Sequence, residues 1–292
     1  MTTPTTFPST ETLAPMDGFY LTRDGLRIHY LDWGNPNAMP LVLIHGLRAY
    51  AHTWDLVAQE LRNDFHVIAV DVRGRGDSDW DPNHNYFTAT YCMDVEDLVS
   101  YLEIKKLAII GHSMGGATAI LYAGRYPDRL SAAVIVDAGP AAEPPTPGIV
   151  RIGNELSTTP ATFRSWDDAA NFLRAQRPTA SEESMRIRLR ASLKQLPDGA
   201  VTWKYDLRGL QEARGNPAGR IDLWPYLRAI KCPTLIVRGA RSDVFLPPMA
   251  QRMVATMASA RLVEVSNAGH PVWDDNLAGF NREVKAFLSR LL

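Results

Sequence analysis

The sequence predicts an α/β protein built on a mostly parallel sheet, and three observations predict it. Short runs rich in Val, Ile and Leu recur along the chain without polar alternation, which is typical of strands buried on both faces. Amphipathic segments with helical spacing lie between these runs. The regular alternation of the two kinds of segment favours a doubly wound sheet with helices on both faces.

The predicted elements are short and follow one another closely. The predicted strands cover residues 19–22, 26–33, 41–45, 65–70, 107–110, 133–136, 234–237 and 262–265. The first two flank Asp24-Gly25, which is a hairpin signal. The predicted helices cover residues 54–61, 91–102, 117–126, 249–257 and 280–292. Together these segments form the expected core domain, residues 17–139 and 225–292, after a flexible N-terminal tail, residues 1–16.

One long segment, residues 140–224, breaks the alternation because it contains no run of the buried-strand type. It begins with PAAEPPTPG and ends near RGNPAG, two Pro/Gly-rich stretches typical of loops. Between them, apolar residues recur at helical spacing at positions 185, 189, 193 and 196. We therefore interpret residues 140–224 as a helical cap inserted over the sheet.

The composition and net charge of the chain limit the kinds of molecule that it is expected to bind. The 292 residues are 46% hydrophobic, enough for one sizeable core, and 31 basic against 32 acidic residues give a net charge of −1. This balance argues against nucleic acid or an anionic membrane and favours a neutral or weakly charged small molecule. No apolar run approaches the roughly 20 residues of a membrane span, and no basic, apolar leader precedes Arg23. We expect a cytoplasmic protein of undetermined oligomeric state.

The sequence GHSMG, residues 111–115, fits the pattern G-x-S-x-G between a predicted strand and a predicted helix. A sharp strand-to-helix turn strains the serine backbone, and it leaves no room for side chains two residues before or after, so glycine stands at both positions. The turn exposes the hydroxyl of Ser113 at the start of a helix, where backbone N–H groups are unpaired. We interpret Ser113 as a nucleophile.

A serine hydroxyl needs a base, and His270 is the best-placed of the seven histidines. It follows the last predicted strand, and loops after parallel strands share one edge of the sheet. The base needs a carboxylate in turn. Asp243, in the loop after strand 234–237, is preferred, and Asp137, directly after strand 133–136, is the rival. Asp71 and Asp77 are weaker alternatives.

Two backbone N–H groups are expected to form an oxyanion hole. One belongs to Met114, directly after the nucleophile, and the other to Leu47 in the loop after strand 41–45. Gly46 lets that loop approach the site, and His45 is expected to brace it by hydrogen bonding.

These pieces together resemble the α/β-hydrolase superfamily, in its serine-nucleophile, esterase- and lipase-like branch. The resemblance is carried by His45-Gly46, DVRGRGDSDW, GHSMGG, GARSDVF and NAGHPVW, in that order, and it covers nearly the whole chain. It implies an eight-stranded sheet, a cap after the sixth strand, a Ser-His-Asp triad, and no metal or organic cofactor. It also implies that the glycine-rich turn RGRGDSD is scaffolding.

The resemblance narrows the chemistry without fixing the substrate. Dehalogenases and epoxide hydrolases of this superfamily use an aspartate nucleophile, whereas this chain has Ser113. Carbon–carbon bond hydrolases usually carry a glycine- and serine-rich loop where this chain has residues 47–50, LRAY. The sequence therefore predicts a carboxylic ester hydrolase acting through an acyl-enzyme. Carbon–carbon bond, lactone or amide hydrolysis, and a small-molecule receptor that retains the triad, remain as alternatives.

Three further side chains are candidate substrate contacts. Arg48 stands one residue past the expected oxyanion donor, from where it could reach a substrate carboxylate. Trp166 and Trp203 of the cap could line an apolar pocket.

Overall fold

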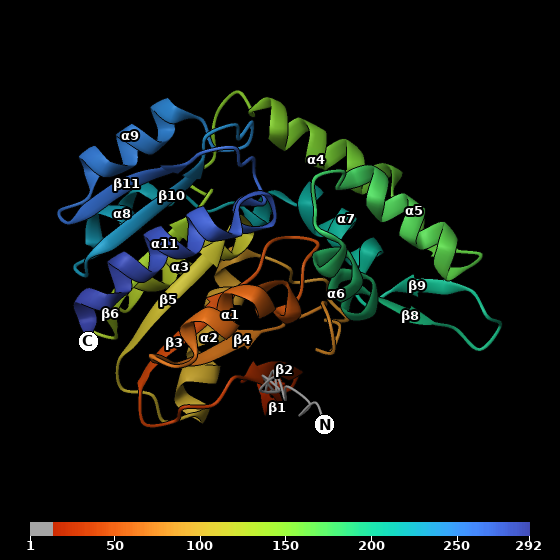
Figure 1. Cartoon of the computed structure of the whole chain (residues 1–292), viewed down its shortest axis with the longest axis horizontal. Coiled ribbons are helices and arrows are strands. Elements are labelled where there is room, and N and C mark those ends of the chain that lie inside the picture. Colours follow the sequence, from red (N-terminus) through yellow and green to blue (C-terminus); the bar gives the residue numbers. More distant parts are fainter. Residues whose placement is uncertain (1–13) are drawn as a thin grey trace, which may run out of the picture.

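The computed structural model describes residues 14–292, and it contains an eight-stranded sheet in the order β1-β2-β4-β3-β5-β6-β10-β11 (Figure 1). The first two pairings, β1 with β2 and β2 with β4, are antiparallel, and all others in this sheet are parallel. The predicted fold class is confirmed. The predicted N-terminal tail lies largely in residues 1–13, outside the described residues, and β1 already begins at Met16.

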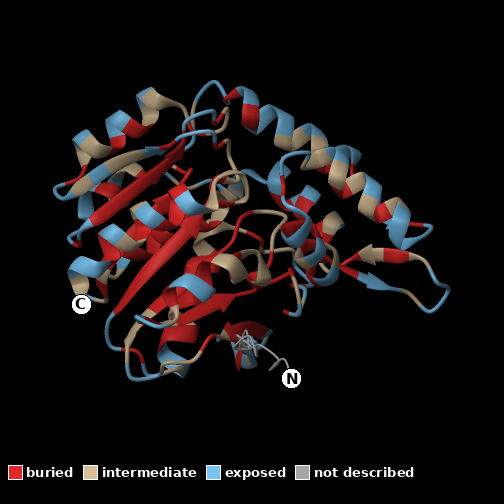
Figure 2. Cartoon of the chain, in the orientation of Figure 1, coloured by how far each residue is buried: buried red, intermediate tan, exposed pale blue. Residues whose placement is uncertain are grey.

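Each predicted strand corresponds to a strand of this sheet, with ends that differ by a few residues. The strands are β1 (Met16–Leu21), β2 (Arg27–Asp32), β3 (Met39–Ile44), β4 (Phe65–Val70), β5 (Leu107–His112), β6 (Leu130–Val136), β10 (Thr234–Gly239) and β11 (Ala260–Val265). β5 and the last four residues of β3 are fully buried (Figure 2). In β3, Val42 and Ile44 face one apolar cluster, whereas Leu41 and Leu43 face the other.

Helices cover both faces of the sheet (Figure 1). One face carries α1 (Asp55–Leu61), α10 (Val272–Asp275) and α11 (Leu277–Leu288), and the other carries α2 (Thr88–Tyr101), α3 (Met114–Arg125), α8 (Trp224–Ala229) and α9 (Pro247–Thr256). Short 3-10 turns occur at η1 (Ala51–Trp54), η2 (Pro217–Gly219) and η3 (Ser289–Leu291). The central helix α3, which begins directly after Ser113, packs against α2 and α8.

The segment between β6 and α8 forms a separate layer beyond the carboxyl ends of the strands (Figure 1). Its helices are α4 (Pro147–Thr158), α5 (Trp166–Gln176), α6 (Glu182–Ser192) and α7 (Leu207–Gly215). Side chains of Thr146, Ser165 and Ser181 cap the first three of these helices by accepting hydrogen bonds from backbone N–H groups. The boundaries 140 and 224 of a cap domain stay a prediction.

This segment is not purely helical, contrary to the sequence prediction. It also contains a small antiparallel sheet of β7 (Thr162–Phe163), β9 (Val201–Trp203) and β8 (Leu193–Gln195), in that order. The predicted apolar helix through position 196 therefore ends at Ser192. The cause is local, because Asp198-Gly199 makes a hairpin turn in which Gly199 has a positive φ of 87°.

No helix within residues 14–292 is long and apolar enough to span a bilayer. The expected cytoplasmic location stays a prediction.

Candidate active site

Ser113 stands on a strained turn between β5 and α3. Its backbone has φ 55° and ψ −117°, a conformation that non-glycine residues rarely adopt. A side chain at Gly111 would overlap the carbonyl of Gly115, and one at Gly115 would overlap the carbonyl of Ile44. The glycine spacing seen in the sequence is therefore a steric requirement. The serine hydroxyl makes no helix-capping bond and is free to meet another group.

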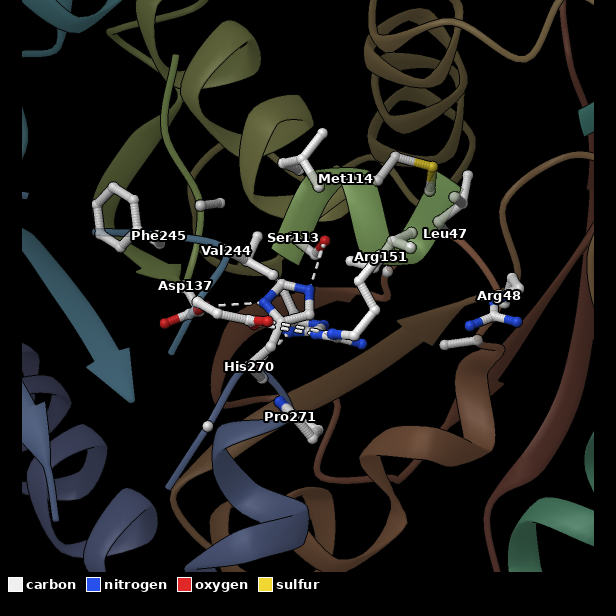
Figure 3. A pocket seen from close by; sticks show the side chains of 18 of the residues that line it. Leu47, Arg48, Ser113, Met114, Asp137, Arg151, Val244, Phe245, His270 and Pro271 are labelled. Atoms are coloured by element: carbon white, nitrogen blue, oxygen red, sulfur yellow. Dashed lines mark hydrogen bonds and ion pairs between the residues drawn. The ribbon is translucent and has the colours of Figure 1, made fainter. Parts of the chain in front are cut away.

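That group is His270, in the loop after β11. Its Nε2 lies 3.0 Å from Oγ of Ser113, and its Nδ1 lies 2.8 Å from Oδ2 of Asp137 (Figure 3). The structure thus brings the predicted nucleophile and the predicted base together, although their positions are 157 residues apart.

The carboxylate beside His270 belongs to Asp137, so the prediction that Asp243 orients this histidine is corrected. The side chain of Asp137 is fully buried, and it accepts hydrogen bonds from the Ser242 hydroxyl at 2.5 Å and the Gly239 N–H at 3.0 Å. The Asp243 side chain is 42% exposed and is bound by Arg151 of α4, with Nη2 at 2.9 Å. The loop after β10 therefore does not supply the carboxylate that contacts His270. It holds that carboxylate, Asp137, in place through the hydroxyl of Ser242.

Burial governs the protonation of this pair. It lowers the pKa of His270, and the charges of Arg177 and Arg151 lower it further. Burial also raises the pKa of Asp137, against the hydrogen bonds from Ser242 and Gly239. At neutral pH His270 is therefore uncharged, and its Nδ1–H can donate to Asp137 while Nε2 remains available as an acceptor.

A second histidine positions the first. His112 is buried, and burial together with the neighbouring His270 lowers its pKa to about 3. Its neutral ring places Nε2 at 2.9 Å from the backbone carbonyl of His270, so Nε2 carries the proton and donates it. The two rings lie 4.6 Å apart, and Trp273 packs edge-on against His112 at 4.7 Å.

The loop after β3 approaches Ser113 from the other side. The N–H groups of Leu47 and Met114 donate no hydrogen bond to any residue in the described part of the chain. His45 braces this loop as predicted, because its Nδ1 lies 2.8 Å from the Gly46 carbonyl and its Nε2 accepts from the Val72 N–H at 3.2 Å.

Arg75, from the glycine-rich turn after β4, holds both candidate donor residues. Its Nε donates to the Leu47 carbonyl at 3.1 Å, and its Nη2 lies 3.6 Å from the sulfur of Met114. The guanidinium is buried and lies 5.1 Å from the ring centre of Tyr86. The turn that was expected to be scaffolding is therefore linked to the site through Arg75, and the sequence carries no local signal for this link.

A cavity of about 700 Å³ opens above Ser113. Its walls are the loops that follow β3, β5, β6, β10 and β11, together with α4 and the end of α5. Both polar and apolar side chains line it, among them Met114, Val244, Phe245 and Arg151 (Figure 3). A cavity at the carboxyl ends of parallel strands is where ligands bind in open α/β sheets.

Of the three candidate substrate contacts, only Arg48 lines this cavity. It is already paired with Glu155, with Nη2 at 2.5 Å from the carboxylate. Trp203 is 4% exposed and packs among the cap aromatics, with its Nε1–H donating to the Pro160 carbonyl at 2.7 Å. Trp166 is 40% exposed on α5 and does not line the cavity. The structure therefore contradicts the pocket role predicted for both tryptophans.

Within the described residues, one group of side chains has ligand atoms close enough for a metal ion: His29, Asp71 and Asp77. Each of these side chains already has hydrogen-bond partners in the chain, and the carboxylate of Asp77 is bound by Lys204. Asp71 binds His29 Nδ1 at 2.7 Å and also accepts from the N–H groups of Ala51 and Asp77. We interpret the cluster as support for the turn after β4.

Comparison with known proteins agrees with this architecture. The sequence profile of the alpha/beta hydrolase fold family matches residues 39–277, and the chain belongs to this family. It is 33% identical over 258 residues to the 3-hydroxybutyrate-oligomer hydrolase of Cupriavidus necator, covering 84% of this chain and 87% of the relative. It is 29% identical over 284 residues to the N-formylmaleamate deformylase of Pseudomonas putida, covering 94% and 97%.

A solved structure of an alpha/beta hydrolase from Novosphingobium aromaticivorans is 28% identical and aligns with a TM-score of 0.80, covering 96% of this chain and 98% of the other. The protein is therefore a hydrolase of α/β fold.

Proposed function

We propose that the protein hydrolyses carboxylic esters of small molecules through an acyl-enzyme formed on Ser113. The observation that carries this proposal is the hydrogen-bonded chain from Ser113 through His270 to Asp137 at the floor of the cavity. A hydroxyl, a neutral imidazole and a buried carboxylate in this order are the parts that activate a serine for attack on a carbonyl.

In the first half of the reaction, Oγ of Ser113 attacks the ester carbonyl while Nε2 of His270 takes its proton. Asp137 keeps the imidazole in the tautomer that accepts at Nε2 and stabilises the cation that forms. The N–H groups of Leu47 and Met114 bind the negative oxygen of the tetrahedral intermediate. His270 then protonates the departing alcohol. In the second half, water attacks the acyl-enzyme with the same residues in the same roles.

The named relatives support this chemistry. An oligomer of a hydroxy acid is a chain of esters, and the relative named as hydrolysing such oligomers is 33% identical. Amide hydrolysis by the same residues is the second candidate, because another relative is named as a deformylase of an N-formyl compound. Rates on an ester and an amide with the same acyl group separate the two candidates.

The test compares Ser113→Ala with Ser100→Ala, the same substitution at an exposed position of α2. We expect Ser113→Ala to lower kcat for para-nitrophenyl esters by at least about 10³-fold and to abolish labelling by a fluorophosphonate probe. Ser100→Ala should retain both, and the two variants should unfold at similar temperatures. Labelling or turnover retained by Ser113→Ala would refute the proposal.

A further inference from the structure

The cavity above Ser113 is rich in charge, and three of its arginines are paired with carboxylates. Six arginines and five carboxylates line it. Arg48 is bound to Glu155, and Arg151 is bound to both Glu155 and Asp243. Nη2 of Arg188, on α6, lies 2.8 Å from the carboxylate of Asp274. In each of these ion pairs the positive and negative charges neutralise each other.

Two more of the lining arginines, Arg214 and Arg241, donate to the backbone carbonyls of Ile149 and Asn267. The guanidinium of Arg177 differs from the other five. Arg177 directly follows α5, lines the cavity and is partly buried. Its backbone N–H bonds to the Leu173 carbonyl, but its guanidinium makes no hydrogen bond or ion pair with any residue from 14 to 292. Burial, followed by the like charge of Arg188, lowers its pKa to about 10, so the side chain still carries a positive charge at neutral pH.

The acidic side chains around Arg177 are already engaged. Asp274 accepts from Ser184 in addition to Arg188, and Asp275 accepts from the Thr179 hydroxyl and the Gly269 N–H. Glu155 is shared by two other arginines. A partly buried cation without a partner among residues 14–292 is costly, and the guanidinium is shaped for two parallel hydrogen bonds to a carboxylate. The part of the cavity lined by Arg177 is therefore complementary to an anion that comes from outside the chain.

We propose that Arg177 binds a carboxylate of the substrate, so that this hydrolase prefers esters that carry a negatively charged carboxylate on their acyl or alcohol part. The inference rests on the proposed function and goes beyond it by naming the substrate class. Arg177 is a binding residue that selects and orients the substrate, while Ser113 and His270 carry the chemistry.

The test uses pairs of substrates that differ only in charge. In the first pair, the para-nitrophenyl monoester of glutarate is compared with its methyl ester, which places the carboxylate on the acyl part. In the second, a butyrate ester of a hydroxy acid is compared with its methyl ester, which places the carboxylate on the alcohol part. Both pairs are assayed with the wild-type enzyme, Arg177→Gln and Arg177→Lys. Arg214→Gln is the matched control, because Arg214 lines the same cavity and, within the described residues, its side chain donates only to the Ile149 carbonyl.

We expect the wild-type enzyme to prefer the charged member of at least one pair. Arg177→Gln should lower kcat/KM for that member by at least about 30-fold, mainly through KM, and should change kcat/KM for the neutral member less than about threefold. Arg177→Lys should restore part of the loss, and Arg214→Gln should behave like the wild-type enzyme. The pair that shows the effect tells which part of the substrate carries the carboxylate.

Binding of glutarate and of its neutral diamide, measured by calorimetry on Ser113→Ala and on Ser113→Ala/Arg177→Gln, separates the two proposals because it needs no turnover. Stronger binding of glutarate that depends on Arg177 supports the carboxylate site even if ester hydrolysis fails. Equal use of charged and neutral substrates by the wild-type enzyme, or an equal loss for both in Arg177→Gln, would overturn the carboxylate site and leave the proposed function untouched.

Discussion

Oδ2 of Asp137 lies 2.8 Å from Nδ1 of His270, and this contact joins the end of β6 to the loop after β11. A second aspartate, Asp243, lines the same cavity from the neighbouring strand end but is bound by Arg151. Two carboxylates thus stand at adjacent positions of the sheet edge, and only one of them touches the imidazole. The difference between them can be measured directly.

Asp137→Asn should lower kcat by about 10³- to 10⁴-fold, because an amide cannot stabilise the imidazolium and favours the wrong tautomer of His270. Asp243→Asn should lower kcat less than about tenfold, since its carboxylate is half-exposed and serves Arg151. Steady-state kinetics on one ester with both variants makes the comparison.

Thermal unfolding of both variants provides the control, because Asp137 also accepts from Ser242 and Gly239 and its replacement can affect packing. If Asp243→Asn were the more damaging change while both variants stayed folded, Asp243 would be the catalytic acid after all.

Arg75→Met should lower kcat by about 10- to 100-fold with little change in KM. A complete oxyanion donor contributes about 3 kcal/mol, and releasing the Leu47 loop removes part of that. Methionine retains the apolar stem but cannot donate to the Leu47 carbonyl. Arg129→Met is the matched control, because Arg129 donates to the Ile104 carbonyl away from the cavity. A kcat loss of the same size in Arg129→Met would mean that general destabilisation, not the loop, explains the effect.

Much of the fold could be predicted from the sequence because its signals are local. Strands buried on both faces leave unbroken apolar runs, as in β5, and the pair of glycines around Ser113 reflects steric overlap with backbone atoms nearby. The pairing of Ser113 with His270 could also be predicted, since strand ends of a parallel sheet meet at one edge.

The choice between Asp137 and Asp243 could not be predicted in this way, because both follow neighbouring strands. It depends on where Arg151 lies, and Arg151 belongs to a cap helix whose position no periodicity gives. The hairpin of β8 and β9 has a sequence signal, the turn Asp198-Gly199. The apolar residues at helical spacing up to position 196 favoured a helix over this hairpin. That Arg177 has no side-chain partner among residues 14–292 depends on its surroundings in the fold, which leave no local signal in the sequence.

Trp203→Phe should lower the free energy of unfolding by about 1–3 kcal/mol, because it leaves the Pro160 carbonyl without its partner and shrinks the cap's aromatic cluster. KM for esters should stay within about twofold, since the side chain does not line the cavity. Trp166→Phe, at an exposed site on α5, should change stability by less than about 0.5 kcal/mol. Denaturant unfolding and KM measurements test both variants. A raised KM in Trp203→Phe at unchanged stability would mean that Trp203 contacts the substrate after all.

On the acid side of the pH profile, kcat/KM should fall only below pH 6.5, the ordinary pKa of a histidine side chain. His270 acts as a base only when neutral, so activity falls as the pH drops through its pKa, and burial with the charges of Arg177 and Arg151 lowers that pKa. A lower pKa keeps the base unprotonated to a lower pH. Because His270 is coupled to Asp137, the measured value belongs to the pair.

Arg151→Gln should move this fall in kcat/KM to higher pH, by about one unit. The substitution removes a positive charge that lowers the pKa of His270, and it frees the carboxylate of Asp243, whose charge raises that pKa. Both effects have the same sign. Arg164→Gln is the control, because Arg164 is exposed, does not line the cavity and, among residues 14–292, pairs with Asp168 alone. The kcat/KM of a neutral ester, measured from about pH 2.5 to 8, covers the lowered pKa of His270 and shows the shift. A fall that moves to lower pH in Arg151→Gln would mean that charges at the cavity wall do not set the protonation of His270.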